Sequence, residues 1–257
     1  MELGEGLYIS GEVKTIEDGI AKPVLIVSHG FRGHRLWGFW PDVTTRFAEQ
    51  GFYTISYDFS RVSARKEELG EQAVAEASTV STELLDLESL ISELFQGALP
   101  LSKEADTVRL ALLGHSRAGG SSIIFASEHE QVKAVAVWNG GGTPSLPPRD
   151  SSNPPLSLQE QALVKDVEVN AERFNITDKF AQLQIPVLLV QGAKDNERLL
   201  AQNQFLQEAA PHQHFVSIAG GDHFFGAADP YEGSTRQLDE AVEDTIQFFK
   251  TVFSGKA

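Results

Sequence analysis

The pattern of hydrophobic and polar positions divides the chain into alternating strands and helices. Short apolar runs, typical of strands that are covered on both faces, occur at 23–28, 52–58, 108–113, 132–138, 185–191 and 214–218. Longer segments that favour helices lie between and after these runs, at about 41–51, 70–95, 117–126, 200–209 and 235–252. A further strand is expected over 7–14. Strands that alternate with helices predict an α/β fold, with a doubly wound, mostly parallel sheet flanked by helices.

One stretch interrupts this alternation, between Thr143 and about Asn175. Prolines are dense in its first half, at Pro144, Pro147, Pro148, Pro154 and Pro155. Helical segments are expected in its second half, near 157–173. We interpret 143–175 as a small lid or cap insertion within a single domain that spans 1–257, a length that suits one large domain.

The charge balance limits the kinds of partner that the chain can have. Acidic residues number 36 and basic residues 21, which gives a formal net charge of -15. A field of that sign opposes binding to nucleic acids and to anionic membranes, so neither partner is expected. The first residues are acidic and lack the apolar core of a signal peptide, and no apolar run is long enough to span a membrane, so a cytoplasmic location is expected.

Cysteine is absent from the sequence, which restricts the available chemistry. Disulfides, thiolate metal sites and a cysteine nucleophile are therefore excluded. We expect no metal and no cofactor, so the reaction has to rely on ordinary side chains.

A sharp turn between a strand and a helix is the strongest chemical signal. The apolar run that ends near Leu113 leads into Gly114-His115-Ser116-Arg117-Ala118, and a helix follows. Small residues, Gly114 and Ala118, stand two positions to either side of Ser116, where a tight reversal leaves no room for a larger side chain. This pattern is typical of a nucleophile elbow, which lifts a serine hydroxyl above the sheet beside a helix N-terminus. The usual last glycine of the motif is alanine here.

A serine nucleophile needs a base, and the base needs an acid that orients it. Ligands of parallel sheets bind beyond the carboxyl ends of the strands, so the residues that follow each strand are the candidates. Asp195 follows one strand, 79 residues after Ser116, and His223 follows the last strand, 28 residues later. We predict a triad of Ser116, Asp195 and His223, with Glu197 as the alternative acid.

Five motifs together carry a family resemblance: 29–33, 57–60, 114–120, 192–195 and 221–224. From about Pro23 to Phe249 the chain resembles the α/β-hydrolase superfamily, in the branch of small serine esterases related to dienelactone hydrolases and cinnamoyl or feruloyl esterases. The resemblance implies that the backbone N–H groups of Phe31 and Arg117 form an oxyanion hole. Dienelactone hydrolases proper use a cysteine nucleophile, so the serine in this chain argues against that particular activity.

Arginines and aromatic residues gather at the predicted edge of the site. Five of the eleven arginines fall in these loops: Arg32, Arg35, Arg61, Arg65 and Arg117. They either recognise an anionic group of the substrate or form ion pairs with neighbouring acids such as Asp58, Glu67 and Glu68. Phe31, Trp37, Phe39, Trp40 and Trp138 either line a pocket or pack in the core. As candidate substrate contacts we select Arg32, Trp37, Arg61 and Trp138.

The sequence therefore predicts a carboxylesterase that forms an acyl-enzyme on Ser116, with esters of small or aromatic acyl groups as substrates. Two alternatives stay open: an amidase or peptidase of the same fold, and a non-catalytic binding protein on the hydrolase scaffold. A dehalogenase or an epoxide hydrolase would need a carboxylate where Ser116 stands. The oligomeric state also stays open between a monomer and a homodimer.

Overall fold

A computed structural model describes residues 1–144, 146 and 155–255. Within these residues, seven strands form one sheet in the order β3-β5-β4-β6-β7-β8-β9. Their bounds are β3 Ser10–Lys14, β4 Lys22–Ser28, β5 Tyr53–Asp58, β6 Ala105–His115, β7 Val132–Trp138, β8 Val187–Gly192 and β9 His214–Ile218. Every neighbouring pair is parallel except β3 with β5. The predicted fold class, a mostly parallel α/β sheet, is confirmed.

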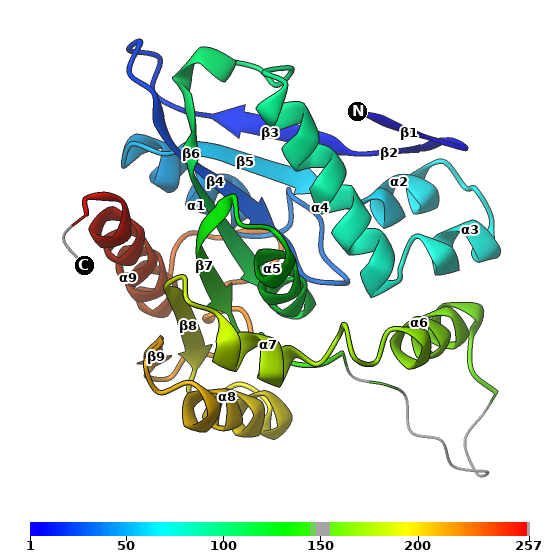
Figure 1. The fold of residues 1–257 in the computed structure, drawn as a ribbon. Coiled ribbons are helices and arrows are strands. Elements are labelled where there is room, and N and C mark those ends of the chain that lie inside the picture. The colour runs from blue at the N-terminus through cyan, green and yellow to red at the C-terminus, as the bar shows by residue number, and fades with distance from the viewer. Residues whose placement is uncertain (145, 147–154, 256–257) are drawn as a thin grey trace.

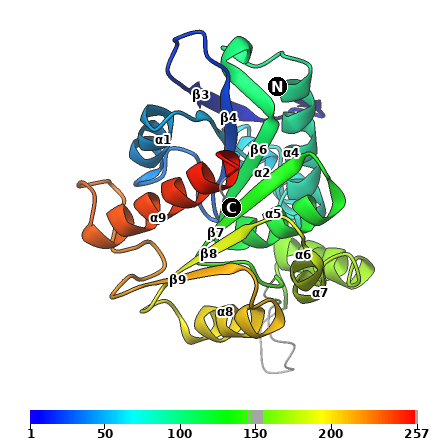
Figure 2. The ribbon, with the colours of Figure 1, turned by 60° about the vertical axis from the view of Figure 1, so that its left-hand side comes forward.

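Helices cover both faces of this sheet (Figures 1 and 2). On one face lie α1 Trp40–Glu49 and α9 Arg236–Phe253, which share a core cluster with the strands beneath them. The other face carries α4 Val80–Phe95, α5 Arg117–Glu128, α7 Ile176–Gln182 and α8 Glu197–Ala209. Successive residues of β6 alternate between the faces, with Leu110 and Leu112 in one cluster and Ala111 and Leu113 in the other. This two-sided burial explains why the strands read as continuous apolar runs.

The segment after β5 differs from the prediction. The single helix expected over 70–95 is divided into α3 Glu71–Glu76 and α4, and α2 Ser60–Lys66, which was not predicted, precedes them. The division falls at Thr79, whose side chain accepts a hydrogen bond from the backbone N–H of Thr82 and so caps α4. Good helix-forming residues on both sides of this cap hide the interruption in the sequence pattern.

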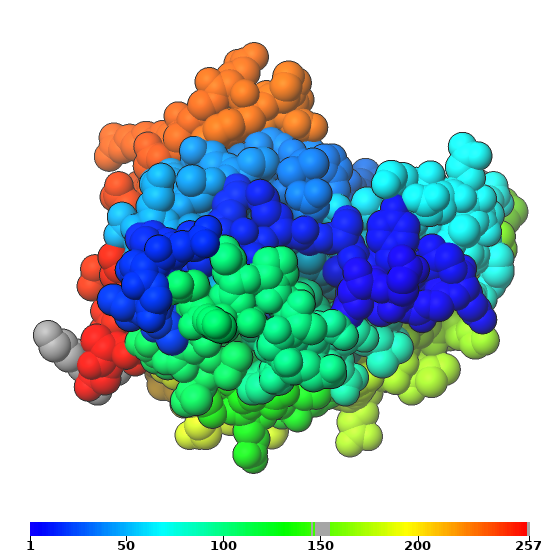
Figure 3. All heavy atoms as spheres, turned by 90° about the horizontal axis from the view of Figure 1, so that it is seen from above, coloured from blue at the N-terminus to red at the C-terminus, as the bar shows by residue number. Residues whose placement is uncertain are grey.

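The N-terminal strand is also divided. The strand expected over 7–14 is split into β2 Leu7–Tyr8 and β3, and β2 forms a small hairpin with β1 Glu2–Gly4. This hairpin, dark blue in Figure 3, lies beside the cyan segment that holds α2 and α3. There the backbone N–H of Tyr8 donates to Ser63 of α2, and the Tyr8 hydroxyl donates to Glu67.

The predicted insertion over 143–175 lies partly outside the described residues, which omit 145 and 147–154. In the remainder, α6 Leu158–Val169 begins with a capping box between Ser157 and Glu160. Asp166 of α6 reaches the N-terminus of α4, where it accepts hydrogen bonds from the backbone of Val80 and Ser81. No described helix is long and apolar enough to cross a membrane.

Candidate active site

The turn between β6 and α5 holds Ser116 in a rare backbone conformation, with φ 57° and ψ -123°. The surroundings leave almost no free space: a Cβ atom at Gly114 would lie 2.3 Å from the carbonyl oxygen of Ala118, and one at Gly140 would lie 2.0 Å from that of Ser116. The backbone N–H of Ser116 donates to the carbonyl of Trp138 at 2.8 Å. Glycine at both positions is therefore required for the elbow to close.

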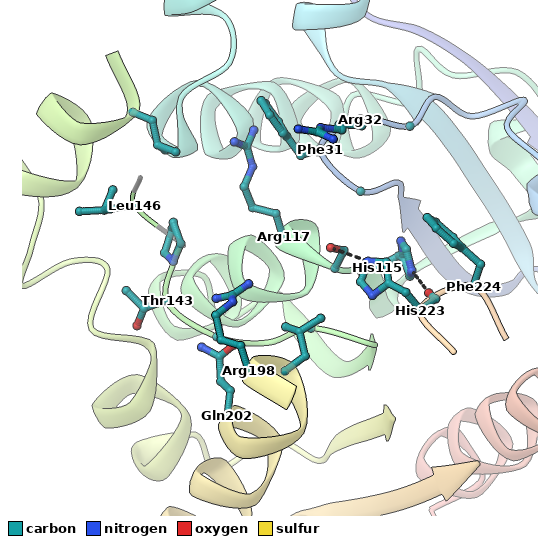
Figure 4. A pocket seen from close by; sticks show the side chains of 18 of the residues that line it. Phe31, Arg32, His115, Arg117, Thr143, Leu146, Arg198, Gln202, His223 and Phe224 are labelled. Carbon is teal, nitrogen blue, oxygen red and sulfur yellow. Dashed lines mark hydrogen bonds between the residues drawn. The ribbon is translucent and has the colours of Figure 1, made fainter. Parts of the chain in front are cut away.

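The three residues of the predicted triad lie in hydrogen-bonding order. The hydroxyl of Ser116 is 3.1 Å from Nε2 of His223 (Figure 4). On the other side of the ring, Nδ1 of His223 lies 3.0 Å from Oδ2 of Asp195 and 3.2 Å from Oδ1. Glu197, the alternative acid, is the first residue of α8 and has no such contact. The geometry is that of a nucleophile, a base and an orienting acid.

The environment of Asp195 keeps this carboxylate charged. Burial opposes its ionisation, but hydrogen bonds from His223, the backbone of Asn196 and the amide of Gln191 outweigh that effect and hold its pKa below the ordinary value. The distances of the last two are 2.7 Å and 3.0 Å. Asp195 is thus suited to orient His223 and to stabilise its protonated form.

Asn139, which the sequence analysis did not single out, joins the acid loop to the base loop. Its side-chain oxygen accepts from the backbone of Gly192 at 2.7 Å and from the amide of Gln191 at 3.2 Å. Its amide nitrogen donates to the carbonyls of Asp222 and His223 at 3.2 and 3.0 Å. Asn139 follows β7 and has a positive φ of 49°, a conformation that asparagine adopts more readily than most residues. A hydropathy pattern does not reveal this backbone requirement.

A second histidine, His115, holds the backbone of His223 by a hydrogen bond. His115 is buried, and its Nε2 donates to the backbone carbonyl of His223 at 2.9 Å. Burial, and secondarily the neighbouring His223, lower the pKa of His115 to about 3. His115 therefore stays neutral and acts as a fixed hydrogen-bond donor near neutral pH.

Two backbone N–H groups stand unused beside the serine. Within the described residues, neither Phe31 nor Arg117 donates its backbone N–H to another residue. The loop that carries Phe31 passes close to the nucleophile, since a Cβ atom at Gly30 would lie 3.3 Å from Cβ of Ser116. Arg117 directly follows Ser116 at the N-terminus of α5. These are the two N–H groups that the family resemblance implies for an oxyanion hole.

A cavity of about 750 Å³ opens in front of Ser116. Of the expected substrate contacts, Arg32 and Trp37 line it. Its far side comes from α8, as Figure 4 shows with Arg198 and Gln202 facing the loop of Phe31 and Arg32. These α8 residues were not predicted as substrate contacts, although they closely follow Asp195 in the chain.

The other two expected contacts lie outside the cavity. Trp138 is fully buried at the end of β7, where it stacks on Trp40 and donates its indole N–H to Thr245 at 2.9 Å. Arg61 is also fully buried, and its Nη1 lies 2.7 Å from Oε1 of Glu83. Both predictions were wrong. The hydropathy pattern places these residues correctly near the carboxyl edge of the sheet, but it does not show whether each side chain is buried or faces the cavity.

Ion pairing also accounts for two more of the arginines. Nε of Arg35 lies 3.4 Å from Asp58, and the guanidinium of Arg117 contacts Glu83. Arg65 is exposed, and its guanidinium carbon lies 5.9 Å from the ring centroid of Phe31. Arg32 is exposed and has no ion pair or hydrogen bond with another described residue. No cluster of three or more His, Asp or Glu side chains within the described residues could hold a metal ion.

A parallel sheet flanked by helices, with a serine at the strand-to-helix elbow followed along the chain by an acid and a histidine, defines the α/β-hydrolase class. The family comparison is more specific: residues 11–253 match the model of the dienelactone hydrolase family, and the chain belongs to this family. A dienelactone is a cyclic carboxylic ester. The chain is thus a hydrolase of carboxylic esters, the class that the sequence predicts.

Solved structures agree on the fold. Est1E from Butyrivibrio proteoclasticus is 18% identical with a TM-score of 0.71, over 98% of this chain and 97% of that chain. A dienelactone hydrolase from Anabaena variabilis is 16% identical with a TM-score of 0.68, over 97% and 94%. A puromycin-hydrolyzing peptidase from Mycobacterium tuberculosis is 17% identical with a TM-score of 0.65, over 97% of this chain but 38% of that chain. No match was found among curated proteins.

Proposed function

We propose that the protein hydrolyses carboxylic esters through an acyl-enzyme on Ser116. The observation that carries this proposal is the unbroken series of hydrogen bonds from Ser116 through His223 to Asp195 at the cavity, with two unused backbone N–H groups beside the hydroxyl. Each member of the series has the chemistry that its position demands: a hydroxyl, an imidazole and a charged carboxylate.

In the first half of the reaction, Ser116 attacks the ester carbonyl. His223 takes the hydroxyl proton at Nε2, and Asp195 stabilises the imidazolium through Nδ1. The carbonyl oxygen becomes an oxyanion that the N–H groups of Phe31 and Arg117 stabilise, by about 3 kcal/mol per donor. The tetrahedral intermediate then collapses, the C–O bond to the alcohol breaks, and the alkoxide leaves with the proton from His223.

The second half repeats these steps with water. His223 removes a proton from water, the hydroxide attacks the acyl carbon, and the same two N–H groups hold the second oxyanion. Collapse releases the carboxylic acid and returns the proton to Ser116. No step requires a group that the chain lacks.

The cavity supports esters with small or aromatic acyl groups as substrates. Aromatic rings from two loops form one of its walls, where Trp37 and Phe224 pack with ring centroids 4.4 Å apart. Est1E, one of the structural neighbours, has been seen with ferulic acid bound, an aromatic acid. An aromatic acyl group would stack on such a wall at low entropic cost.

We also propose that α6 acts as a cover over the site, the described part of the lid predicted for 143–175. Glu160 and Leu163 of α6 line the cavity, together with Thr143 and Pro144. The rest of the chain would form one domain around the sheet.

The triad proposal is tested by Ser116→Ala. We expect kcat/KM for p-nitrophenyl acetate and p-nitrophenyl butyrate to fall by about 10⁴-fold or more, because the nucleophile is lost while the fold stays intact. Labelling by a fluorophosphonate probe should disappear as well. The matched control is Ser127→Ala, on the exposed part of the same helix, which should keep wild-type activity. Unchanged esterase activity in Ser116→Ala would rule out the acyl-enzyme.

The similarity to a peptidase makes amide hydrolysis the second candidate. Amines are poorer leaving groups than alcohols, and the match covers 38% of that peptidase. A panel of p-nitroanilides against p-nitrophenyl esters with matched acyl groups decides between the two. A ratio of kcat/KM near one would favour an amidase.

A further inference from the structure

A buried carboxylate that the mechanism does not use lies behind the oxyanion hole. Glu83, on α4, is 1% exposed. Its Oε1 accepts hydrogen bonds from Arg61 Nη1 at 2.7 Å and from Arg117 Nε and Nη2 at 2.9 and 2.5 Å. Its Oε2 accepts from the hydroxyl of Ser121 at 2.7 Å. Glu83 is therefore the shared partner of side chains from α2 and α5, and it lies outside the residues that line the cavity.

This cluster is charged in spite of its burial. Burial alone would favour the neutral acid, but Arg117 and Arg61, with their hydrogen bonds and that of Ser121, outweigh it and hold the pKa of Glu83 below its ordinary value. A buried ion cluster of this kind adds little net stability compared with apolar residues, because each ion has lost its hydration. Stability alone therefore does not explain a buried ion cluster at this position next to Ser116.

The first arginine of the cluster helps to hold the peptide that carries one oxyanion donor, together with His29 and the backbone N–H of Gly33. Arg61 donates to the carbonyl of Gly30 at 3.1 Å and to that of Phe31 at 3.0 Å. The Gly30 carbonyl belongs to the same planar peptide group as the Phe31 N–H, and in a trans peptide the two point in opposite directions. Holding the oxygen with a cation therefore fixes the direction of the N–H and strengthens it as a donor.

The second arginine carries the other oxyanion donor itself. The guanidinium of Arg117 is held by Glu83 and by the carbonyl of Ser78 at 3.0 Å. It also lies over the ring of Phe31, with its carbon 3.8 Å from the ring centroid. Arg117 and Phe31 are thus joined by a direct contact as well as through the carboxylate.

We propose that Glu83 is a positioning residue that sets the separation and direction of the two oxyanion donors by holding Arg61 and Arg117 together. The proposal rests on the proposed function, since it assigns the N–H groups of Phe31 and Arg117 to the oxyanion. It explains why a buried carboxylate and two arginines, far apart in the sequence, meet behind the serine. It also gives the residue after the nucleophile a structural reason to be arginine.

The test is Glu83→Gln, which keeps the shape of the side chain and removes its charge. We expect kcat for p-nitrophenyl butyrate to fall by about 10- to 100-fold with KM within about threefold, since loss of a whole oxyanion donor costs about 10²- to 10³-fold and misplacement costs less. A trifluoromethyl ketone provides the second readout. Ser116 Oγ bonds to its carbonyl carbon, His223 takes the proton, and the carbonyl oxygen keeps the negative charge, so its inhibition constant should rise by a similar factor.

A matched control separates positioning from stability. Glu104→Gln breaks another mostly buried ion pair, in which Oε2 of Glu104 lies 2.8 Å from Nζ of Lys22, at a place outside the cavity lining. Both variants should lose thermal stability, and only Glu83→Gln should lose kcat and ketone affinity. If Glu83→Gln does not fold, the double variant Arg61→Met/Glu83→Gln serves instead, because it removes one buried positive and one buried negative charge together. This variant should fold and show the same loss of kcat.

Two results would overturn the proposal: a kcat in Glu83→Gln that matches Glu104→Gln, or full kcat in the double variant. Either result leaves the triad in place, because the triad is judged by Ser116→Ala alone. Failure of the proposed function would instead appear as activity that survives in Ser116→Ala.

Discussion

Two of the arginines that line the cavity differ from the third, Arg117, in having no ion-pair partner among the described residues. Arg32 and Arg198 both line the cavity and are exposed, and neither forms an ion pair or hydrogen bond with another described residue. The described acid on the lining, Glu160, is engaged by Ser157 in the capping box of α6. A carboxylate on a substrate would therefore find free guanidinium groups, in a protein whose formal net charge is -15.

We expect the wild-type enzyme to prefer an anionic ester, and Arg198→Gln to reduce that preference. The comparison is p-nitrophenyl hemisuccinate against neutral p-nitrophenyl butyrate. Loss of a charged hydrogen bond of about 1.5 kcal/mol corresponds to a fall of about tenfold in kcat/KM for the hemisuccinate, with less than a twofold change for the neutral ester. Arg32→Gln should act in the same direction.

The control for this pair is Arg236→Gln, an exposed arginine at the start of α9 that changes the net charge equally and does not line the cavity. If it lowers hemisuccinate turnover as much as Arg198→Gln does, the effect comes from the overall field of the protein. If wild type shows no preference for the anionic ester, the free arginines do not bind substrate.

Among individual residues, the candidate triad was easier to predict from the sequence than the residues that pack behind it. Ser116, Asp195 and His223 each follow a strand, so topology alone brings them to one edge. Glu83 lies in the first turn of α4, where the pattern predicts a solvated acidic residue, and its burial depends on how α4 packs on α5. Trp37 and Trp138 look equivalent in the sequence, but Trp138 belongs to β7 and its side chain lies among core residues of the α1 and α9 face.

At the scale of elements, a polar contact between α6 and α4 helps to hold the proposed cover. Asp166 of α6 accepts from the backbone N–H of Val80 and Ser81 at 2.9 and 3.0 Å, and from the Ser81 hydroxyl at 2.5 Å. These are N–H groups of the first turn of α4, where the helix dipole favours a negative charge. Thr79 already caps this helix, so Asp166 is a second cap supplied by another segment.

Asp166→Ala should therefore loosen α6 more than it destabilises the protein. Loss of a capping carboxylate costs about 1 kcal/mol, which should appear as a small decrease in Tm. Amide hydrogen exchange over 158–169 should become faster, and KM should rise more than kcat falls, because Glu160 and Leu163 of this helix line the cavity. Glu172→Gln, an exposed acid just beyond α6, is the control and should change neither quantity. Unchanged exchange in Asp166→Ala would show that the other contacts of α6, such as the hydrogen bond from Gln159 to Ser78, hold the proposed cover without this cap.

The helices and strands with a strong hydrophobic periodicity were predicted well. The order of the strands in the sheet could not be predicted from the hydropathy pattern. The strands of the parallel sheet were found because burial on both faces makes them continuously apolar. The split between α3 and α4 was missed because residues on both sides are good helix formers, so that the break depends on the Thr79 cap. The sheet order, with β4 between β5 and β6, follows from crossovers that hydropathy does not record.

For the whole molecule, buried titratable groups link stability to pH in opposing directions. Burial, followed by the nearby Arg61, lowers the pKa of His29 well below the ordinary 6.5, and His115 behaves alike, with a pKa of about 3. Burial raises the pKa of Asp86 to about 7, against the hydrogen bond from the backbone of Ser60. Unfolding therefore binds protons at the two histidines and releases one at Asp86 when the pH is between about 5 and 6.5.

In this pH window the two histidines bind more protons on unfolding than Asp86 releases. We therefore expect the free energy of unfolding to decrease as the pH falls from 6.5 to 5. Each group contributes up to about 1.4 kcal/mol per pH unit, and two histidines against one carboxyl leave a limiting slope of about that size. Asp86→Asn removes the opposing group while its oxygen can still accept from Ser60, so its slope should be roughly double. Urea unfolding at several pH values measures this.

Asp42→Asn makes the same change at a side chain that is 41% exposed, and should keep the wild-type slope. The window ends above the range in which Glu83 and Asp195 take up protons, because the pKa values of both lie below the ordinary values of 4.5 and 3.8. Protonation of those two carboxyls would lower the stability further and obscure the comparison. A slope in Asp86→Asn equal to that of the wild type would mean that Asp86 is already ionised in the folded protein, and that the α4 face tolerates a second buried negative charge beside Glu83.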